Sequence, residues 1–212
     1  MSNPKQLDLA SVLQVIRQRG QSGRSLTAIA GAPGAGKSTL AEAVVAKLNE
    51  EAPDSAAMLP MDGYHFDDQV LVPRGLRRRK GAPDTFDVAG FYHVLQRLKR
   101  NEESEIAVPV FDRDLEIARA GARLIPRSVR HLIVEGNYLL LDRPGWSSLR
   151  ELFDTTIMIS VPEAVLRQRL VERWQSYQLP PDEVTAKVET NDLPNGRLIM
   201  STSAPAEFVV SY

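Results

Sequence analysis

Short apolar runs alternate with longer amphipathic segments along the chain, and this alternation indicates an α/β fold with a mainly parallel sheet. Strands are predicted at residues 26–30, 56–61, 132–134, 156–161 and 208–210. Between them, apolar side chains at helical spacing predict helices at residues 7–19, 38–48, 87–98 and 162–174. The run at 132–134 is apolar throughout, which is typical of a strand covered by helices on both faces.

Three features depart from this simple alternation. Residues 107–111 and 122–125 are predicted to pair as strands around a polar turn, and residues 197–201 are predicted to form a strand near the carboxyl end. A loop rich in Pro, Gly and Arg extends from residue 62 to residue 84. We expect this loop to be functional, because irregular loops of this length are otherwise uncommon in compact domains.

A glycine-rich motif follows the first predicted strand. Gly31–Ser38 fits the pattern G-x-x-x-x-G-K-[ST], in which backbone amides surround phosphates, Lys37 adds a positive charge and Ser38 ligates magnesium. The preceding strand and the following helix are the context that the motif requires, whereas the alternative is a chance glycine turn. The residues predicted to bind the nucleotide are Gly31, Ala32, Pro33, Gly34, Ala35, Gly36, Lys37, Ser38 and Thr39.

Two carboxylates are predicted at the ends of strands that flank this motif. Glu135 closes the run 132–134, a position from which it can hold a magnesium-bound water beside Ser38. Asp62 follows the run 56–61, and in a sheet of strand order 2-3-1-4-5 the carboxyl ends of the strands share the edge where ligands bind. A carboxylate there can take the proton of an attacking hydroxyl group. The alternatives are a structural Glu and a turn-forming Asp.

Basic side chains are concentrated in two places. Arg169 and Arg173 share one face of the helix predicted at 162–174, and two guanidinium groups there suit a lid that closes over transferring phosphates. The alternative is a solvated face with ordinary ion pairs. The dense basic cluster in the long loop can receive an anionic substrate or simply be solvated; it contains Arg74, Arg77, Arg78, Arg79 and Lys80.

Other polar residues are weaker candidates for contact with a substrate. Tyr64 and His65 follow Asp62, where they can line a small-molecule pocket or pack in the core. Asn191 belongs to a polar group around a Leu-Pro pair, which predicts a turn, and turn chemistry alone can account for it. Asp192 and Asn195 complete that group.

Composition narrows the possible functions. The chain has 212 residues, which predicts a single domain over residues 1–212, and 43% hydrophobic with 25% charged residues is typical of a soluble globular protein. Lys and Arg total 26 against 27 for Asp and Glu, so the chain lacks the excess of positive charge that a general nucleic-acid binder usually has. With no Cys and three His, any metal is expected to be a hard cation held by oxygen.

Localisation is predicted from what the chain lacks. No apolar run approaches the ~18 residues of a membrane span, and Met1 to Asp8 does not have the layout of a signal peptide. We therefore expect a cytoplasmic protein without a membrane partner. The oligomeric state stays open, with a homodimer as one alternative.

Several segments, in chain order, resemble the uridine kinase, phosphoribulokinase and pantothenate kinase family: Gly31–Ser38, Asp62–His65, Pro83–Asp87, Val134–Gly136 and the helix with Arg169 and Arg173. The resemblance covers nearly the whole chain. Residues 191–210 are most similar to bacterial pantothenate kinases, and residues 74–87 resemble small bacterial kinases found with sugar importers and named as fructose transport kinases. The resemblance implies a P-loop NTPase three-layer sandwich, ATP as donor, magnesium as cofactor and a small hydroxyl compound as acceptor.

The resemblance also implies roles for the matching residues. Asp62 would be the general base, and Glu135 would contact magnesium or substrate. Lys37 and Ser38 would bind phosphate and metal, Arg169 and Arg173 would belong to a lid at about 165–181, and Tyr64 and His65 would face the acceptor. The segment Asp62–His65 is Asp-Gly-Tyr-His where the family has Asp-x-Phe-Tyr, and this departure bears on uridine specificity.

The residue types near Asp62 favour some classes of acceptor over others. Few apolar aromatic residues follow Tyr64 before Asp87, which favours hydrogen bonding to a polyol over stacking of a nucleobase, and Arg77 and Lys80 would suit an anionic group. We expect a sugar or sugar phosphate first, then a pantothenate-like hydroxy acid, then a nucleoside.

Two other classes of protein are less well supported. A P-loop regulatory ATPase would use the nucleotide for conformational change, but the Asn-Lys-x-Asp and Leu-Ser-Gly-Gly-Gln signatures of the commonest switches are missing from the chain. An RNA-binding module built on residues 74–80 is disfavoured because aromatic side chains are not interleaved with the basic ones.

Overall fold

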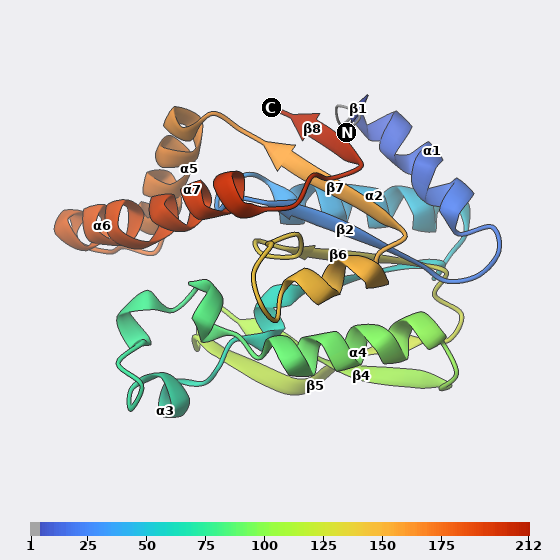
Figure 1. The fold of residues 1–212 in the computed structure, drawn as a ribbon, viewed down its shortest axis with the longest axis horizontal. Coiled ribbons are helices and arrows are strands. Elements are labelled where there is room, and N and C mark those ends of the chain that lie inside the picture. The colour runs from blue at the N-terminus through green and yellow to red at the C-terminus, as the bar shows by residue number, and fades with distance from the viewer. Residues whose placement is uncertain (1–4) are drawn as a thin grey trace.

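The computed structural model describes residues 5–212 and has a six-stranded sheet between helices, with a separate two-stranded sheet beside it (Figure 1). The expectation for Met1 to Asp8 falls partly on residues 1–4, which lie outside the described residues. The strands are β1 (Lys5–Gln6), β2 (Ser25–Gly31), β3 (Ala56–Pro60), β4 (Glu105–Asp112), β5 (Ile117–Pro126), β6 (His131–Gly136), β7 (Thr155–Ser160) and β8 (Phe208–Ser211).

The helices lie between these strands, in the alternation that the sequence predicts. They are α1 (Leu9–Arg19), α2 (Lys37–Glu51), α3 (Asp68–Leu71), α4 (Val88–Arg100), α5 (Glu163–Ser176), α6 (Pro181–Lys187) and α7 (Leu193–Thr202). Short 3₁₀ turns are found at Met61–Tyr64, Arg77–Arg79, Pro83–Thr85 and Ser147–Leu152, and a π-helical turn at Val188–Asp192. Within residues 5–212, no helix is long and apolar enough to cross a membrane.

The main sheet is parallel, and its order is β1-β8-β7-β2-β6-β3. The predicted strands 1 to 5 correspond to β2, β3, β6, β7 and β8, so the predicted order 2-3-1-4-5 is confirmed, and β1 extends it at one edge. The strand before the glycine motif, β2, therefore lies in the middle of the sheet between β6 and β7. The motif emerges at the carboxyl edge, where ligands of parallel α/β sheets bind.

Apolar side chains cover both faces of the sheet. In β2, Leu26 and Ala28 pack on the face that α4 covers, whereas Ile29 packs on the face that α1 and α2 cover. Successive residues of a strand point to opposite faces, so a strand covered on both sides has to be apolar throughout. Phe91, Leu95 and Leu98 of α4 are almost fully buried in the first of these clusters.

The predicted strand pair is confirmed as an antiparallel hairpin, β4 with β5, which has an irregularity between Val108 and Val110. The hairpin packs closely on the 3₁₀ turn Met61–Tyr64. A Cβ atom on Gly63 would lie 2.6 Å from the carbonyl oxygen of Pro109, so a larger residue would push the two apart. Gly63 therefore lets the hairpin approach the turn that carries Asp62.

The structure corrects two predictions for the carboxyl-terminal region. Residues 197–201 belong to helix α7 and not to a strand, and Asn191 lies in the π-helical turn and not in a Leu-Pro turn. A short apolar run such as Leu198–Met200 has no periodicity that separates a strand from a helix. Pro194 directly follows the π-helical turn, within a helical segment that runs without a break from Pro181 to Thr202, and it has no N–H to donate there.

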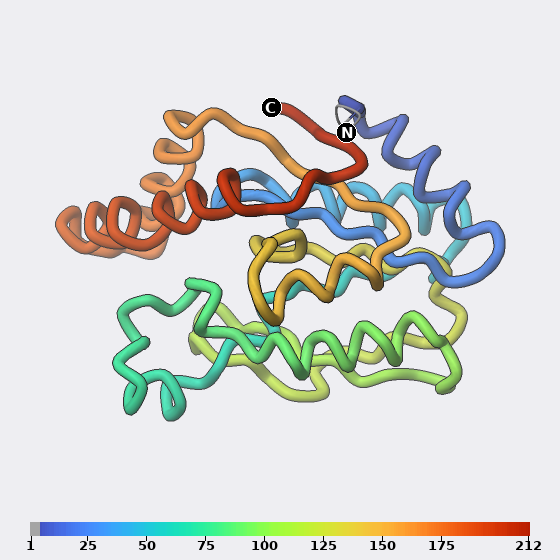
Figure 2. The backbone as a smooth tube through the Cα atoms, viewed as in Figure 1, coloured from blue at the N-terminus to red at the C-terminus, as the bar shows by residue number. Residues whose placement is uncertain are grey.

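The helices α5 to α7 and the loop that contains α3 extend beyond the sheet on the same side of the molecule (Figure 2). The two segments are far apart in the sequence, but both project past the carboxyl edge, from which the glycine motif emerges. The space at this edge is therefore bounded by both of them.

Burial of α4 supplies a test of the fold. Leu95 is fully buried, and Leu124 on the hairpin is 51% exposed. Leu95→Ala should lower the free energy of unfolding by about 2–5 kcal/mol, because it leaves a cavity in the core. Leu124→Ala is the matched control and should change it by less than about 0.5 kcal/mol. Urea denaturation of both variants measures the difference, and equal losses would contradict the burial of α4.

Candidate functional site

The glycine motif forms a phosphate-binding loop between β2 and α2. Gly34 and Gly36 have φ angles of +79° and +93°, a region of backbone conformation that glycine adopts far more readily than other residues. Helix α2 begins at Lys37, so the first free amides of the helix point into the loop. The Lys37 ammonium donates a hydrogen bond to the carbonyl oxygen of Ala32 at 3.0 Å, and burial lowers its pKa.

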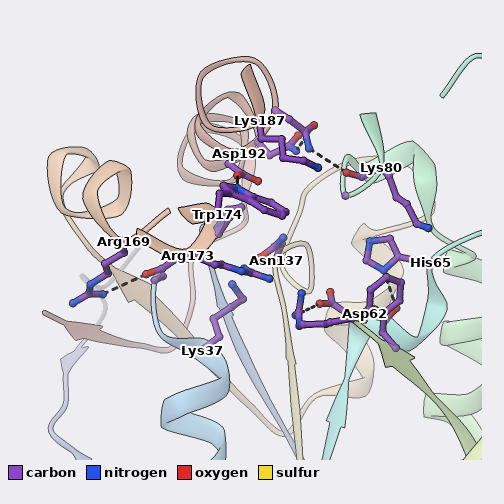
Figure 3. A pocket seen from close by; sticks show the side chains of 18 of the residues that line it. Lys37, Asp62, His65, Lys80, Asn137, Arg169, Arg173, Trp174, Lys187 and Asp192 are labelled. Atoms are coloured by element: carbon purple, nitrogen blue, oxygen red, sulfur yellow. Dashed lines mark hydrogen bonds and ion pairs between the residues drawn. The ribbon is translucent and has the colours of Figure 1, made fainter. Parts of the chain in front are cut away.

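A cavity of about 840 Å³ opens above this loop. Its floor contains Pro33–Thr39 and Glu135. One wall comes from the loop after β3 and from the hairpin, and the other from α5, α6, the π-helical turn and α7. Figure 3 shows Asp62, His65 and Lys80 on the first wall facing Trp174, Lys187 and Asp192 on the second, with Arg173 below Trp174 and Lys37 at the floor.

Glu135 lies at the end of β6 and is only 6% exposed. Burial raises its pKa to about 7, although the charge of Lys37 and a hydrogen bond from the Ser38 hydroxyl act in the opposite direction. Glu135 and Ser38 are thus adjacent oxygen donors on the cavity floor, beside the phosphate loop.

These two oxygen donors fit a magnesium ion. Residues 5–212 contain no group of three or more His, Cys, Asp or Glu side chains that could hold a metal ion. Magnesium does not require such a group, because it keeps several water ligands and takes others from substrate phosphates. The Ser38 hydroxyl and the Glu135 carboxylate suit this hard cation.

Asp62 lies in the 3₁₀ turn that follows β3, just beyond the strand end that the sequence predicts. Its Oδ2 accepts a hydrogen bond from Nη2 of Arg113 at 2.8 Å. Arg113 belongs to the turn of the hairpin, fifty-one positions away in sequence. Sequence analysis missed Arg113, because only tertiary packing brings the hairpin turn to Asp62.

His65 lines the cavity, whereas Tyr64 does not. The His65 ring packs on Phe86 and Phe111 at centroid distances of 4.0 and 4.8 Å. Tyr64 is 7% exposed and packs on Phe91 in the core at 4.6 Å. The expectation that Tyr64 faces the acceptor is therefore corrected: consecutive residues of this turn point in different directions, and Tyr64 points to the core.

Arg77 and Lys80 both line the cavity, and both bind the same carboxylate. The guanidinium of Arg77 and the ammonium of Lys80 donate to Asp68 of α3. Lys80 also donates to the carbonyl oxygen of Glu116 at 2.6 Å. Much of the positive charge that the sequence concentrates in this loop is thus balanced within the loop.

The two arginines of α5 that the sequence singles out lie beside the phosphate loop. Nη1 of Arg169 donates to the carbonyl oxygen of Gly34 at 3.4 Å, and Arg173 lines the cavity. The guanidinium carbon of Arg173 is 5.6 Å from the centre of the Trp174 ring. The predicted lid at about 165–181 comprises most of α5, the connection to α6 and the first residue of α6.

Asn191 connects the two walls. Its side-chain amide donates to the carbonyl oxygen of Lys80 at 3.1 Å, and Asn195 donates to its Oδ1 at 3.2 Å. The sequence pattern points to Asn191, Asp192 and Asn195 as one polar group, and all three line this wall. It does not point to Trp174 and Lys187 on the same wall, or to Asn137 after β6. Trp174 has helical spacing with core leucines, so its pattern predicts packing and gives no signal for a cavity.

The raised pKa of Glu135 gives a prediction for the nucleotide-free protein. A carboxyl whose pKa rises from 4.5 to about 7 on folding stabilises the fold fully below about pH 4.5, and this contribution is lost as the pH rises through 7. Replacing the Glu135 carboxyl by the neutral amide of Gln removes this dependence of stability on pH. The free energy of unfolding of Glu135→Gln minus that of the parent should therefore be larger at about pH 8 than at about pH 5, by on the order of 2 kcal/mol.

Urea denaturation at the two pH values measures this difference. Glu116→Gln is the matched control, since Glu116 also lines the cavity but is exposed. The difference in free energy of unfolding between Glu116→Gln and the parent should change by less than about 0.5 kcal/mol between the same pH values. A Glu135→Gln difference that does not depend on pH would contradict the raised pKa.

Comparison with known proteins places this site in a family. No family model matches the chain. A Schizosaccharomyces pombe protein named "Putative uridine kinase C227.14" is 32% identical over 179 residues, which cover 81% of this chain and 76% of that protein. An ATP-dependent kinase-like protein of Aspergillus versicolor is 31% identical over 159 residues, 71% of this chain and 92% of that one.

A solved structure is similar over almost the entire chain. The crystal structure of a "putative fructose transport system kinase" from Silicibacter is 42% identical, superposes with a TM-score of 0.88 and covers 97% of this chain and 99% of that one. The relatives share the kinase designation but differ in the substrate that their names give. Together with the phosphate loop at the centre of a parallel sheet, they show that the chain is an ATP-dependent kinase of the P-loop family that includes uridine kinase, phosphoribulokinase and pantothenate kinase.

Proposed function

We propose that this kinase transfers the γ-phosphoryl group of MgATP to a hydroxyl group of a small metabolite, and that the metabolite is a sugar or a sugar derivative. The observation that carries the proposal is the cavity that joins the phosphate loop to Asp62. Its volume of about 840 Å³ is within the range of small-molecule sites and leaves room for an acceptor beside the phosphates.

The phosphate end of the cavity supplies positive charge where negative charge develops during transfer. Backbone amides of the loop and the Lys37 ammonium would bind the β- and γ-phosphates, and Arg169 and Arg173 would approach them from α5. Magnesium, when bound, neutralises charge on these phosphate oxygens. Ser38 and Glu135 would hold it, directly or through water.

Asp62 would act as the general base. Its carboxylate accepts the proton of the acceptor hydroxyl while the hydroxyl oxygen forms a bond to the γ-phosphorus and the bond from that phosphorus to the bridging oxygen of ADP breaks. In the structure Asp62 is paired with Arg113, so the acceptor has to reach a carboxylate that already accepts one hydrogen bond. Arg113 would keep the Asp62 carboxylate oriented toward the cavity.

The lining of the acceptor side supports a sugar over a nucleobase. The ring of Phe111 is in contact with His65, and the Lys80 ammonium lies 5.6 Å from its centre. Phe86 is 4% exposed. Phe86 and Phe111 therefore offer little free face to a base, and Arg173 and Lys187 already lie over the ring of Trp174. Polar side chains from both walls, such as His65, Asn137 and Asn195, can bind hydroxyl groups.

Release of ADP in the presence of ATP and one acceptor at a time tests the proposal. The panel should contain sugars, sugar phosphates, hydroxy acids such as pantothenate, and nucleosides. We expect the highest kcat/KM for a sugar or sugar derivative. A nucleoside as the preferred acceptor would contradict the assignment and would favour the activity named in the fission yeast relative.

Substitution of the base separates chemistry from binding. Asp62→Asn should lower kcat by about 10² to 10⁴, because the amide cannot take the proton, while the affinity for ATP stays within about twofold. The matched control is Asp114→Asn in the exposed hairpin turn, which should keep the parental kcat. Full kcat in Asp62→Asn would exclude Asp62 as the base.

The lid hypothesis predicts a change in hydrogen exchange. Residues 165–181 should become more protected when a non-hydrolysable ATP analogue binds, because closure brings Arg169 and Arg173 to the phosphates. Helix α4 lies on the face of the sheet away from the lid contacts and serves as the internal reference. Equal exchange of residues 165–181 with and without the analogue would contradict a mobile lid.

A further inference from the structure

The tip of the hairpin, residues 113–116, carries the arginine that binds Asp62. Apolar side chains such as Ile106 and Val108 anchor the body of the hairpin in the core, whereas residues 113–116 are exposed. A two-stranded sheet gives its own tip little support. The contacts that hold this tip from outside therefore decide where the guanidinium of Arg113 lies, and with it the hydrogen bond of 2.8 Å to Asp62.

Lys80 supplies such a contact from the wall that also carries Asp62 and His65 (Figure 3). Its ammonium donates to the carbonyl oxygen of Glu116 at 2.6 Å and lies 5.6 Å from the centre of the Phe111 ring. Glu116 has a φ angle of +57°, which residues other than glycine seldom adopt unless their surroundings fix it. Lys80 thus contacts the hairpin on both sides of Arg113 in the sequence.

Lys80 is itself held in place, although it belongs to a long loop. Its carbonyl oxygen accepts from the amide of Asn191 at 3.1 Å, and the carbonyl oxygen of Gly81 accepts from the Tyr138 hydroxyl at 2.7 Å. The Lys80 side chain is only 7% exposed, and its ammonium also donates to Asp68 at 2.9 Å. A buried ammonium that donates to a carboxylate and a carbonyl has a defined position, so the loop offers the hairpin a fixed point.

These contacts distinguish Lys80 from the other basic residues of its loop. Arg77 donates to Asp68, which lies outside the hairpin, and Arg79 is exposed and is not among the residues that line the cavity. Lys80 has three donor hydrogens, and protein oxygen atoms already accept two of its hydrogen bonds. Its surroundings therefore fit a connection between two parts of the protein better than capture of an anionic group.

We propose that Lys80 is a positioning residue for phosphoryl transfer. It fixes the tip of the hairpin so that Arg113 reaches Asp62 and holds the Asp62 carboxylate toward the acceptor hydroxyl. This inference rests on the proposed function, in which Asp62 is the general base. Lys80 acts on the rate of transfer through Arg113 and makes no contact with the acceptor.

Hydrogen exchange of the nucleotide-free protein tests the connection between Lys80 and the hairpin. Lys80→Met keeps an unbranched side chain but removes the donor, so residues 112–118 should exchange at least about tenfold faster than in the parent. Exchange in β2 is the internal reference for global unfolding. Unchanged exchange of residues 112–118 in Lys80→Met would overturn the proposal.

Arg79→Met is the matched control for the loss of charge. It removes one positive charge from the same loop, but Arg79 is exposed and lies outside the lining of the cavity. Residues 112–118 should exchange in Arg79→Met as in the parent. Equal acceleration in Arg79→Met and Lys80→Met would show a general effect of charge and would also overturn the proposal.

A double-mutant cycle tests whether Lys80 acts through Arg113. The acceptor is the compound with the highest kcat/KM in the ADP-release panel. Lys80→Met and Arg113→Leu should each lower kcat by about tenfold, because the base is less well oriented, and the double variant should be no slower than Arg113→Leu. The KM for the acceptor should stay within about twofold of the parental value in Lys80→Met.

Two kinetic results would contradict this role. Losses of kcat that multiply in the double variant would show that Lys80 acts independently of Arg113, as a residue that only stabilises the fold would. A raised KM for the acceptor with parental kcat in Lys80→Met would show that Lys80 binds the acceptor directly.

Arg113→Leu keeps the proposal open to refutation if Lys80→Met does not fold. Arg113 is exposed, and substitutions at exposed positions seldom change stability by much. Parental kcat in Arg113→Leu would overturn the proposal whatever Lys80→Met does.

Separate measurements report on the proposed function. Full kcat in Asp62→Asn, or no release of ADP with any acceptor, would contradict the proposed function. The hydrogen-exchange experiment needs neither nucleotide nor acceptor, so it would still show whether Lys80 holds the tip of the hairpin.

Discussion

The position of β2 between two parallel neighbours is the constraint on which the site depends. Hydrogen bonds on both sides hold the strand from Ser25 to Gly31, so the phosphate loop leaves a rigid base at the carboxyl edge. In the register of the sheet, Glu135 is paired with Ile29 on one side and with Pro60 on the other. The carboxylate of Glu135 is therefore placed between the phosphate loop and the turn that carries Asp62, and no flexible segment has to position it.

The two walls of the cavity are assembled from segments that are distant in sequence. Gly63 allows the hairpin to approach the Asp62 turn, which brings Arg113 to the carboxylate. Asn191 links the helical wall to the loop at Lys80, and Trp174 is hydrogen-bonded to Asp192 within that wall. The hairpin is anchored by buried apolar side chains such as Ile106 and Val108. The link from Asn191 to the loop is a single polar contact, and it can break at small cost when a ligand enters.

Much of the positive charge in the loop after Asp62 is paired with a carboxylate, and this reduces the attraction of the loop for anionic ligands. The sequence concentrates positive charge in the loop after Asp62, but Asp68 of α3 takes up both Arg77 and Lys80. Lys37, Arg169 and Arg173 line the phosphate end, and Lys187 lines the helical wall, so the cavity keeps positive charge that these pairs do not take up. This distribution suits a nucleotide donor that carries several negative charges.

The sequence alone determined the features that depend on local order along the chain. Apolar runs and helical periodicity predicted the strands and the hairpin. The spacing of Gly31–Ser38 predicted the phosphate loop, because such a loop is built from contiguous residues, and the order 2-3-1-4-5 followed from the sheet that this motif implies. Tertiary structure decided which side chains face the cavity, and it turned Tyr64 to the core. It also decided that residues 197–201 are helical. Packing also decided that Arg113 donates to Asp62 and that Trp174 donates to Asp192. Contacts between distant segments depend on how packed elements meet, so they leave no periodic signal in the sequence.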